Sequence, residues 1–98
     1  MNRTDAVRKL QQHADAVKSM GATALYLFGS TVRNEARPSS DLDLFIDYDQ
    51  AKRFSLIDLI SIKQFLEENL SVAVDVTTRN SLHPLLRDDI EQSAIRVF

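Results

Sequence analysis

Residues 23–43, TALYLFGSTVRNEARPSSDLD, hold the pattern from which the fold and the chemistry can be predicted. An apolar run ends in Gly29-Ser30, and after ten further residues Asp41 and Asp43 begin an alternating stretch. Glycine permits close approach of the backbone to a ligand, and the free amides and hydroxyl of a helical turn opened by Ser30 can bind phosphate oxygens. The pattern predicts a buried strand that ends in a phosphate-binding turn, followed by a strand that carries carboxylates.

The acidic side chains lie in two stretches that alternate as β-strands do. In 41–48 (DLDLFIDY), Asp41 and Asp43 fall on one face, because successive side chains point to opposite faces of a strand. In 71–77 (SVAVDVT), the single acid Asp75 lies between valines. We expect this strand to pair beside the first and to be central in the sheet. A carboxylate there is costly unless it is paired or binds a metal.

Three carboxylates that meet at one point predict a divalent metal site. The chain has no Cys and only two His, so its oxygen ligands favour Mg²⁺, or Mn²⁺, over Zn²⁺. Two such ions about 3.5–4 Å apart act in phosphoryl chemistry, one on the attacking hydroxyl and one on the triphosphate. The products would be a nucleotidylated acceptor and pyrophosphate.

Helices are expected on either side of these strands. Apolar residues recur at three- and four-residue spacing over 4–20, and Gly21 follows where a helix C-cap glycine belongs. Over 55–70, Ser55 and Asp58 resemble a capping box at the start of a broad apolar stripe. The residues expected in that stripe are Leu56, Leu59, Ile60, Phe65, Leu66 and Leu70.

The remaining segments complete the expected fold. A helical turn at 31–34 leads into a polar connector over 35–40, and Pro84 suits the first turn of a last helix. The buried side of that helix is expected to consist of Leu85, Leu86, Ile90 and Ala94. Residues 95–98 can add a short strand. Strands that alternate with helices predict an α/β fold of the two-layer α+β kind, with a small mixed sheet of three or four strands flanked by helices.

Length and composition narrow the class of protein. The 98 residues fit one domain, 1–98, and 44% hydrophobic with 27% charged residues is the composition of an ordinary globular protein. A formal charge of −2 offers no broad positive field, which disfavours polymeric nucleic acid as a partner. The chain has no Cys, no apolar signal core and no apolar run of roughly 20 residues, which predicts a cytoplasmic protein outside the membrane. So small a core with an open site also invites homo- or hetero-oligomeric association.

The Gly-Ser pair, the ten-residue spacing and the Asp-x-Asp pair resemble the signature of the MNT, or minimal nucleotidyltransferase, family of the DNA polymerase β superfamily. The resemblance extends over nearly the whole chain. It implies a nucleotidyltransferase fold, Mg²⁺ or Mn²⁺ as cofactor and a nucleoside triphosphate as substrate. The residues that it assigns to nucleotide binding are Gly29, Ser30 and Arg33, and those that it assigns to metal binding and catalysis are Asp41, Asp43 and Asp75.

The resemblance also suggests a partner. Leu82-His83-Pro84 before a helix is similar to the subgroup of MNT proteins that act as antitoxins to a HEPN-domain ribonuclease toxin. In that subgroup, AMP moves from ATP to a toxin tyrosine. Family members often have glycine where this chain has Asn34, and asparagine is expected to preserve the turn because it tolerates a left-handed backbone.

Two other functions are weighed against this one. The first is a nucleotide-binding antitoxin of the same fold, weak or inactive as an enzyme, that neutralises its partner by forming a complex. The second is a phospho-acceptor receiver domain, which needs an acid pair after the first strand and a lysine beyond the third. This chain has Gly-Ser after the first strand and its last lysine is Lys63, so the receiver is disfavoured.

Several polar and aromatic residues are expected to lie outside the site. Asp47 and Asp49 continue the acidic alternation but suit solvation or a turn toward Ala51, and isolated basic residues such as Arg37 and Arg79 are mostly solvated. A histidine before a helix proline, as at position 83, is mostly a cap. The aromatic residues expected to pack in the fold are Tyr26, Phe45 and Tyr48.

Overall fold

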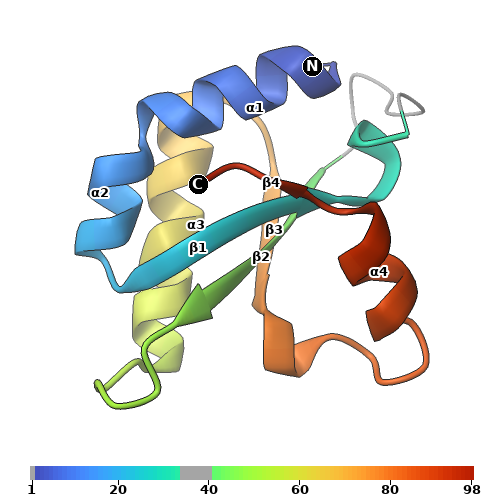
Figure 1. Ribbon diagram of the computed structural model, residues 1–98. Coiled ribbons are helices and arrows are strands. Elements are labelled where there is room, and N and C mark those ends of the chain that lie inside the picture. Colours follow the sequence, from blue (N-terminus) through green and yellow to red (C-terminus); the bar gives the residue numbers. More distant parts are fainter. Residues whose placement is uncertain (1, 34–40) are drawn as a thin grey trace.

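A four-stranded mixed sheet organises the chain (Figure 1). The computed structural model describes residues 2–33 and 41–98, so the predicted connector and Asn34 lie outside the described residues. In chain order the elements are α1 (Arg3–Gln12), α2 (Ala14–Ser19), β1 (Ala22–Phe28), the 3₁₀ turn η1 (Gly29–Thr31), β2 (Leu42–Tyr48), α3 (Leu56–Leu70), β3 (Val74–Thr78), the 3₁₀ turn η2 (Arg79–Ser81), α4 (Arg87–Ser93) and β4 (Ile95–Arg96). The predicted small mixed sheet flanked by helices is confirmed.

The strands are arranged in the order β3-β2-β1-β4. β1 pairs antiparallel with β2 and with β4, whereas β2 pairs parallel with β3 through the α3 crossover. The predicted terminal strand is confirmed, and beyond it Val97 N–H donates to Leu25 O over 2.8 Å. The prediction that the strand carrying Asp75 is central is wrong. It forms one edge because β4, the end of the chain, pairs with β1 on the other side of the sheet.

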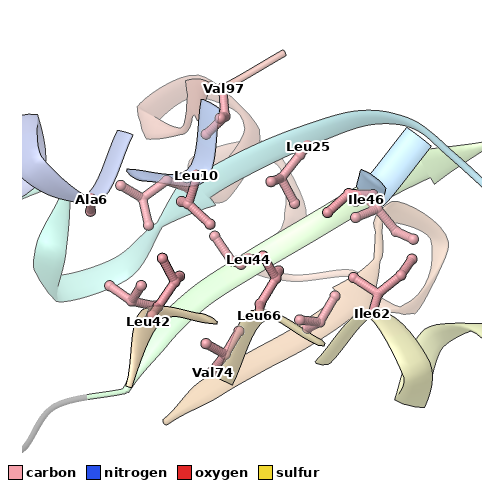
Figure 2. Close-up of a cluster of buried hydrophobic side chains, with 14 of the residues drawn as sticks. Ala6, Leu10, Leu25, Leu42, Leu44, Ile46, Ile62, Leu66, Val74 and Val97 are labelled. Atoms are coloured by element: carbon pink, nitrogen blue, oxygen red, sulfur yellow. The ribbon is translucent and has the colours of Figure 1, made fainter. Parts of the chain in front are cut away.

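One face of the sheet packs against α1, α2 and α3 (Figure 2). The fully buried side chains of this core include Leu10, Val17, Leu25, Leu27, Leu44, Ile46, Ile62 and Leu66. Each such side chain contributes about 1.5–3 kcal/mol relative to exposure. Figure 1 shows α4 apart from these three helices, at the right of the view. The layer of helices thus leaves the opposite face of the sheet to polar and aromatic side chains.

The expected helix over 4–20 is divided into α1 and α2 at His13. The backbone of His13 departs from helical geometry, with φ −107° and ψ 13°. Its ring packs edge-on against Phe65, with 5.5 Å between ring centroids. Histidine has a lower helix propensity than its neighbours Gln12 and Ala14, so interrupting the helix at His13 costs little free energy. Gly21 ends α2 with φ +116°, as predicted.

The capping box at the start of α3 is confirmed, but its predicted stripe needs correction. Ser55 and Asp58 bond reciprocally. The fully inward positions are Ile62, Leu66 and Leu70, spaced by four residues, while Leu56 and Ile60 are 70% and 43% exposed. At 3.6 residues per turn, Ile60 points about 120° away from the middle of that stripe. Leu59 and Phe65 pack partly against the core, as expected.

The buried side predicted for the last helix is wrong. Helix α4 begins at Arg87 rather than near Pro84, and none of its residues is fully buried. Leu85 and Leu86 are 85% and 53% exposed because 84–86 form a turn that precedes the helix. Leu82 is buried in their place. Among the described residues, no helix is long and apolar enough to cross a membrane.

The edge of β3 is protected by a side chain of α3. Glu67 Oε2 accepts a hydrogen bond from Val74 N–H over 3.0 Å. The same oxygen forms an ion pair with Lys63 Nζ, also at 3.0 Å. The Val74 amide and Lys63 hold the pKa of Glu67 below its ordinary value. A backbone amide at an open sheet edge would otherwise be available to another chain.

We predict that Glu67→Gln lowers stability at neutral pH and that the difference from the wild type shrinks in acid. A group whose folded-state pKa is depressed stabilises the fold above its unfolded pKa, and this stabilisation is lost as pH falls through the folded value. The unfolded value for glutamate is about 4.3. Urea denaturation at pH 7 and pH 3 measures the two differences. Equal differences at both pH values would contradict the assignment to the Glu67 charge.

Candidate active site

The acids of β2 and β3 lie side by side on the sheet face opposite the helices. In the parallel register, Asp43 is the partner of Asp75, and neighbouring strands are about 4.8 Å apart. The prediction that the two strands pair is therefore confirmed. Asp41 lies one residue before β2 and is exposed, so the strand begins one residue later than expected. Strand parity and register bring these acids to one end of the sheet.

The Gly29-Ser30 turn borders the same carboxylates. Phe28, the last residue of β1, is the antiparallel partner of Asp43, and Gly29 follows with φ +81°. A Cβ atom added to Gly29 would overlap Asp43 Oδ2 and lie 3.1 Å from Asp43 Cγ. Only glycine therefore fits both the backbone conformation and the space beside the acid. Ser30 follows within η1, so the helical turn begins two residues before the predicted range 31–34.

Two arginines lie at the far side of this turn. Arg33 N–H donates to Gly29 O over 3.4 Å, and the charge of Arg33 acts on the carboxylate of Asp43. Arg3 of α1 donates from Nη1 to Val32 O over 3.2 Å. The Arg33 amide closes the turn, and the bond from Arg3 attaches the turn to the first helix. The structure thus brings the predicted nucleotide-binding residues to the border of the acid pair.

Burial and crowded negative charge together determine the electrostatics of the site. Burial raises the pKa of Asp43, the charges of Asp75 and Asp41 raise it further, and Arg33 lowers it. Like charges near one another disfavour ionisation, whereas a bound cation favours it. The free site is therefore under a repulsion that a divalent cation would relieve.

The residues present suit a hard divalent cation. Carboxylate oxygens without thiolates are the donors that Mg²⁺ and Mn²⁺ prefer. As placed, no three acidic, His or Cys side chains within 2–33 and 41–98 converge closely enough to hold one ion together. The backbone register nevertheless leaves Asp43 and Asp75 within reach of a shared ligand by side-chain rotation, with Asp41 two residues from Asp43.

A second ionic cluster lies farther along the same face. Arg79 binds Asp47 through both Nε and Nη2, at 2.8 and 3.0 Å, and pairs with Glu91 of α4 at 3.4 Å. Its guanidinium lies over the rings of Tyr26 and Phe45, 4.9 and 5.0 Å from their centroids. Bidentate bonding to Asp47 raises the pKa of Arg79 above its ordinary value. Arg79 therefore ties η2, β2 and α4 together.

The sequence analysis missed this cluster. Asp47 and Arg79 are paired with each other instead of solvated, and a usable signal was present: 75, 77 and 79 share one parity, as do 43, 45 and 47. Other expectations are confirmed. Asp49 Oδ1 accepts from Ala51 N–H over 2.9 Å, and His83 Nδ1 accepts from Leu85 N–H over 3.2 Å as a local cap.

The aromatic residues pack in the fold as predicted. Phe45 is fully buried and stacks on Tyr26 with 4.7 Å between ring centroids. Tyr48 stacks on Phe54 at 4.8 Å. Arg37 lies outside the described residues.

We predict that Arg79→Met destabilises the fold by about 1–2 kcal/mol, between the values typical of exposed and of buried ion pairs. Methionine keeps the apolar cover over Phe45 but leaves Asp47 without its bidentate partner. Urea denaturation measures the change, with the exposed Arg53→Met as the matched control. A loss no larger than that of the control would show that the ion pairs contribute nothing to stability.

Comparison with known proteins gives this geometry a family context. The family model described as nucleotidyltransferase domain matches residues 10–97. A Methanocaldococcus jannaschii protein to which protein adenylyltransferase activity is ascribed is 44% identical over 78 residues, which cover 80% of this chain and 82% of the relative.

Two solved structures are also similar. One, ascribed to a minimal nucleotidyltransferase, superimposes with a TM-score of 0.73 and 34% identity, covering 97% of this chain and 95% of the other. The second is a tri-AMPylated Shewanella oneidensis HEPN toxin in complex with an MNT antitoxin, with a TM-score of 0.64 over 90% of this chain and 68% of the other. At 18% identity, the second shows the shared fold alone.

Proposed function

Since the chain belongs to the nucleotidyltransferase domain family, we propose that it transfers AMP from ATP to a hydroxyl of a partner protein. The observation that carries the proposal is the in-register pair of Asp43 and Asp75 beside the Gly29 turn. Acids on one face provide ligands for a cation, and the backbone of the Gly29 turn approaches them closely enough for its amides to bind phosphates of the same ligand. The reaction would take place in the cytoplasm, where ATP and Mg²⁺ are available.

Each site residue has a role in this proposal. Asp41, Asp43 and Asp75 would hold Mg²⁺, or Mn²⁺, while Gly29, Ser30 and Arg33 bind the phosphates of ATP. Bound Mg²⁺ would lower the pKa of the acceptor hydroxyl and neutralise charge on the triphosphate.

The transfer itself is an exchange of one bond for another. The acceptor oxygen forms a bond to the α-phosphorus, the bond from that phosphorus to the bridging oxygen breaks, and pyrophosphate leaves. The hydroxyl proton passes toward Asp75, which faces the reaction from the neighbouring strand. Positioning and charge stabilisation account for most of the rate in such reactions.

The partner in this proposal is a HEPN-domain toxin, which the chain would neutralise as its antitoxin. Two relatives support this choice. One is ascribed protein adenylyltransferase activity, and the antitoxin of similar fold is bound to a HEPN toxin that carries AMP. A hetero-oligomer with the toxin follows from the proposal, because transfer requires that the two proteins meet.

A second candidate function rests on a different observation. As placed, the acids of the described residues do not converge into a group that could hold a metal. This favours an antitoxin that binds nucleotide without transferring it, or transfers it weakly, and neutralises its partner by forming a complex.

Labelled nucleotide separates the two candidates. The protein is incubated with Mg²⁺ and α-labelled ATP, GTP, CTP or UTP, with and without a HEPN-domain protein from the same organism as the proposed acceptor. The products are analysed by gel autoradiography and mass spectrometry, with the Asp41→Asn, Asp43→Asn double variant as control. We expect AMP on the HEPN-domain protein with the wild type alone. Tight binding without label, and equal neutralisation by the double variant, would instead establish the binding antitoxin.

A further inference from the structure

A cavity of about 270 Å³ lies at the carboxyl ends of β2 and β3. The residues that line it include Asp47, Tyr48, Gln50, Arg79, Asn80 and Arg87. It shares the face of the sheet with the acid pair, because Asp47 has the same strand parity as Asp43. These two aspartates are four positions apart on β2, a distance of about 13 Å along the strand. The cavity is therefore close to the candidate active site but distinct from it.

The charges around the cavity are balanced within the protein. Arg79 pairs with Asp47 and Glu91, and Arg87 Nε pairs with Glu91 at 2.6 Å. Two guanidinium groups thus face two carboxylates, which leaves little net charge to attract a phosphate. A ligand of this cavity is recognised mainly by hydrogen bonds.

Two side-chain amides are available to make those hydrogen bonds. Gln50 and Asn80 are exposed, and within the described part of the chain neither carboxamide has a hydrogen-bond partner. A carboxamide both donates and accepts, as a peptide group does. The amides therefore match the backbone of an extended polypeptide.

Exposed leucines lie directly before the cavity-lining Arg87. Leu85 and Leu86 are adjacent in sequence and largely exposed. Adjacent exposed apolar side chains can mark a protein-binding surface, and arginine and tyrosine are enriched at the centres of protein interfaces. The net charge of −2 argues against a polynucleotide at the same place. Polar and apolar features together favour a protein ligand.

We propose that this cavity, with Leu85 and Leu86, binds the acceptor polypeptide of the transfer reaction. About four extended residues span the 13 Å from the acid pair to the cavity, at roughly 3.3 Å per residue. The cavity would thus hold the acceptor backbone a few residues from the hydroxyl that receives AMP. The inference rests on the proposed function and adds the surface that selects the acceptor.

The test fills the cavity from an exposed position outside the acid site. Gln50→Trp places an indole at the cavity, whereas Gln50→Ala leaves it open. Gln12→Trp introduces the same bulk on an exposed position of α1, in the helical layer. The probe is the HEPN-domain protein of the transfer assay. Its binding is measured by calorimetry without nucleotide, and its modification is measured as KM and kcat.

We expect Gln50→Trp to raise both the Kd and the KM for the HEPN-domain protein about tenfold, with the KM for ATP unchanged within about twofold. Gln50→Ala, which removes one of the two amides but leaves the cavity open, should raise both constants only about threefold, and Gln12→Trp should stay close to the wild type. If the KM for ATP rose as much as the KM for the HEPN-domain protein, the inference would be overturned and the cavity would be a nucleotide pocket. If Gln50→Trp still added a first AMP to the HEPN-domain protein but no second or third one, the inference would be overturned. The cavity would then bind the AMP that the acceptor already carries.

The inference and the proposed function can fail separately. If Gln50→Trp binds and modifies the HEPN-domain protein as the wild type does, the cavity is not the acceptor site, although the transfer stands. If the wild type neither binds nor modifies this protein, both the proposed function and the inference fall.

Discussion

We expect Asp43→Asn to lower the rate of nucleotidyl transfer by about 10³-fold, because the cation proposed to bind these carboxylates would contribute several kcal/mol of charge stabilisation in the transition state. Asp43 occupies the centre of the site: it is in register with Asp75, two residues from Asp41 and in contact with the Gly29 turn. Asparagine has nearly the same shape but lacks the charge. The measurement is the single-turnover rate of label transfer at saturating ATP.

The same substitution should leave the free protein at least as stable as the wild type. Burial, then the charges of Asp75 and Asp41, raise the pKa of Asp43 above its ordinary value. A carboxyl with a raised folded-state pKa destabilises the fold at neutral pH, and protonation removes this cost as pH falls through that pKa. The stability difference between Asp43→Asn and the wild type should therefore be largest at pH 7 and shrink in acid.

Asp49→Asn is the matched control for this prediction. Asp49 is exposed, caps the turn at Ala51 and lies outside the site, and asparagine caps such turns equally well. Its transfer rate should equal that of the wild type. If Asp43→Asn kept more than about a tenth of the wild-type rate, the several kcal/mol expected of a metal-binding carboxylate would be absent and the assignment of Asp43 wrong.

Much of the candidate site could be predicted because it depends on local rules. Alternation alone places Asp43 on the face opposite Leu42 and Leu44, and the same rule applies to Asp75. Gly29 ends an apolar strand, so its turn could be located from the sequence. The pairing of the two acid-bearing strands needed one further assumption, which the parallel register bears out.

The parts that could not be predicted depend on contacts between distant segments. Strand order is an example, since nothing in 71–77 indicates that the last residues of the chain will pair with β1 and leave β3 at an edge. The Arg79 pairs with Asp47 and Glu91 span the chain in the same way.

Apolar residues alone also proved ambiguous within the helices. Leu56 and Ile60 carry the same apolar signal as Leu66, yet only Leu66 is fully buried. The packing of α3 against the sheet decides which of its apolar side chains are buried. Leu85 and Leu86 are a second example, since they were expected in the core and instead form part of the proposed acceptor surface.

The second large effect is expected from Gly29→Ala, which should destabilise the fold by about 1–3 kcal/mol and lower transfer by at least about 100-fold. Two causes act together. The backbone of Gly29 has φ +81°, which residues with a side chain rarely adopt, and the added methyl would overlap Asp43 Oδ2. Either the turn or the carboxylate must move, and both are needed where the phosphates of ATP are proposed to bind.

Gly21→Ala separates the loss of stability from the loss of activity. Gly21 also has a positive φ, +116°, and a Cβ there would lie 2.8 Å from the ring of Phe54, between α2 and β1 and away from the acids. Both variants should unfold at lower urea concentration than the wild type. At a temperature where both remain folded, Gly21→Ala should transfer AMP at the wild-type rate, whereas Gly29→Ala should not. Equal rates for the two variants would mean that the close approach of Gly29 to Asp43 serves only the fold, and phosphate binding would then have to be assigned to other groups.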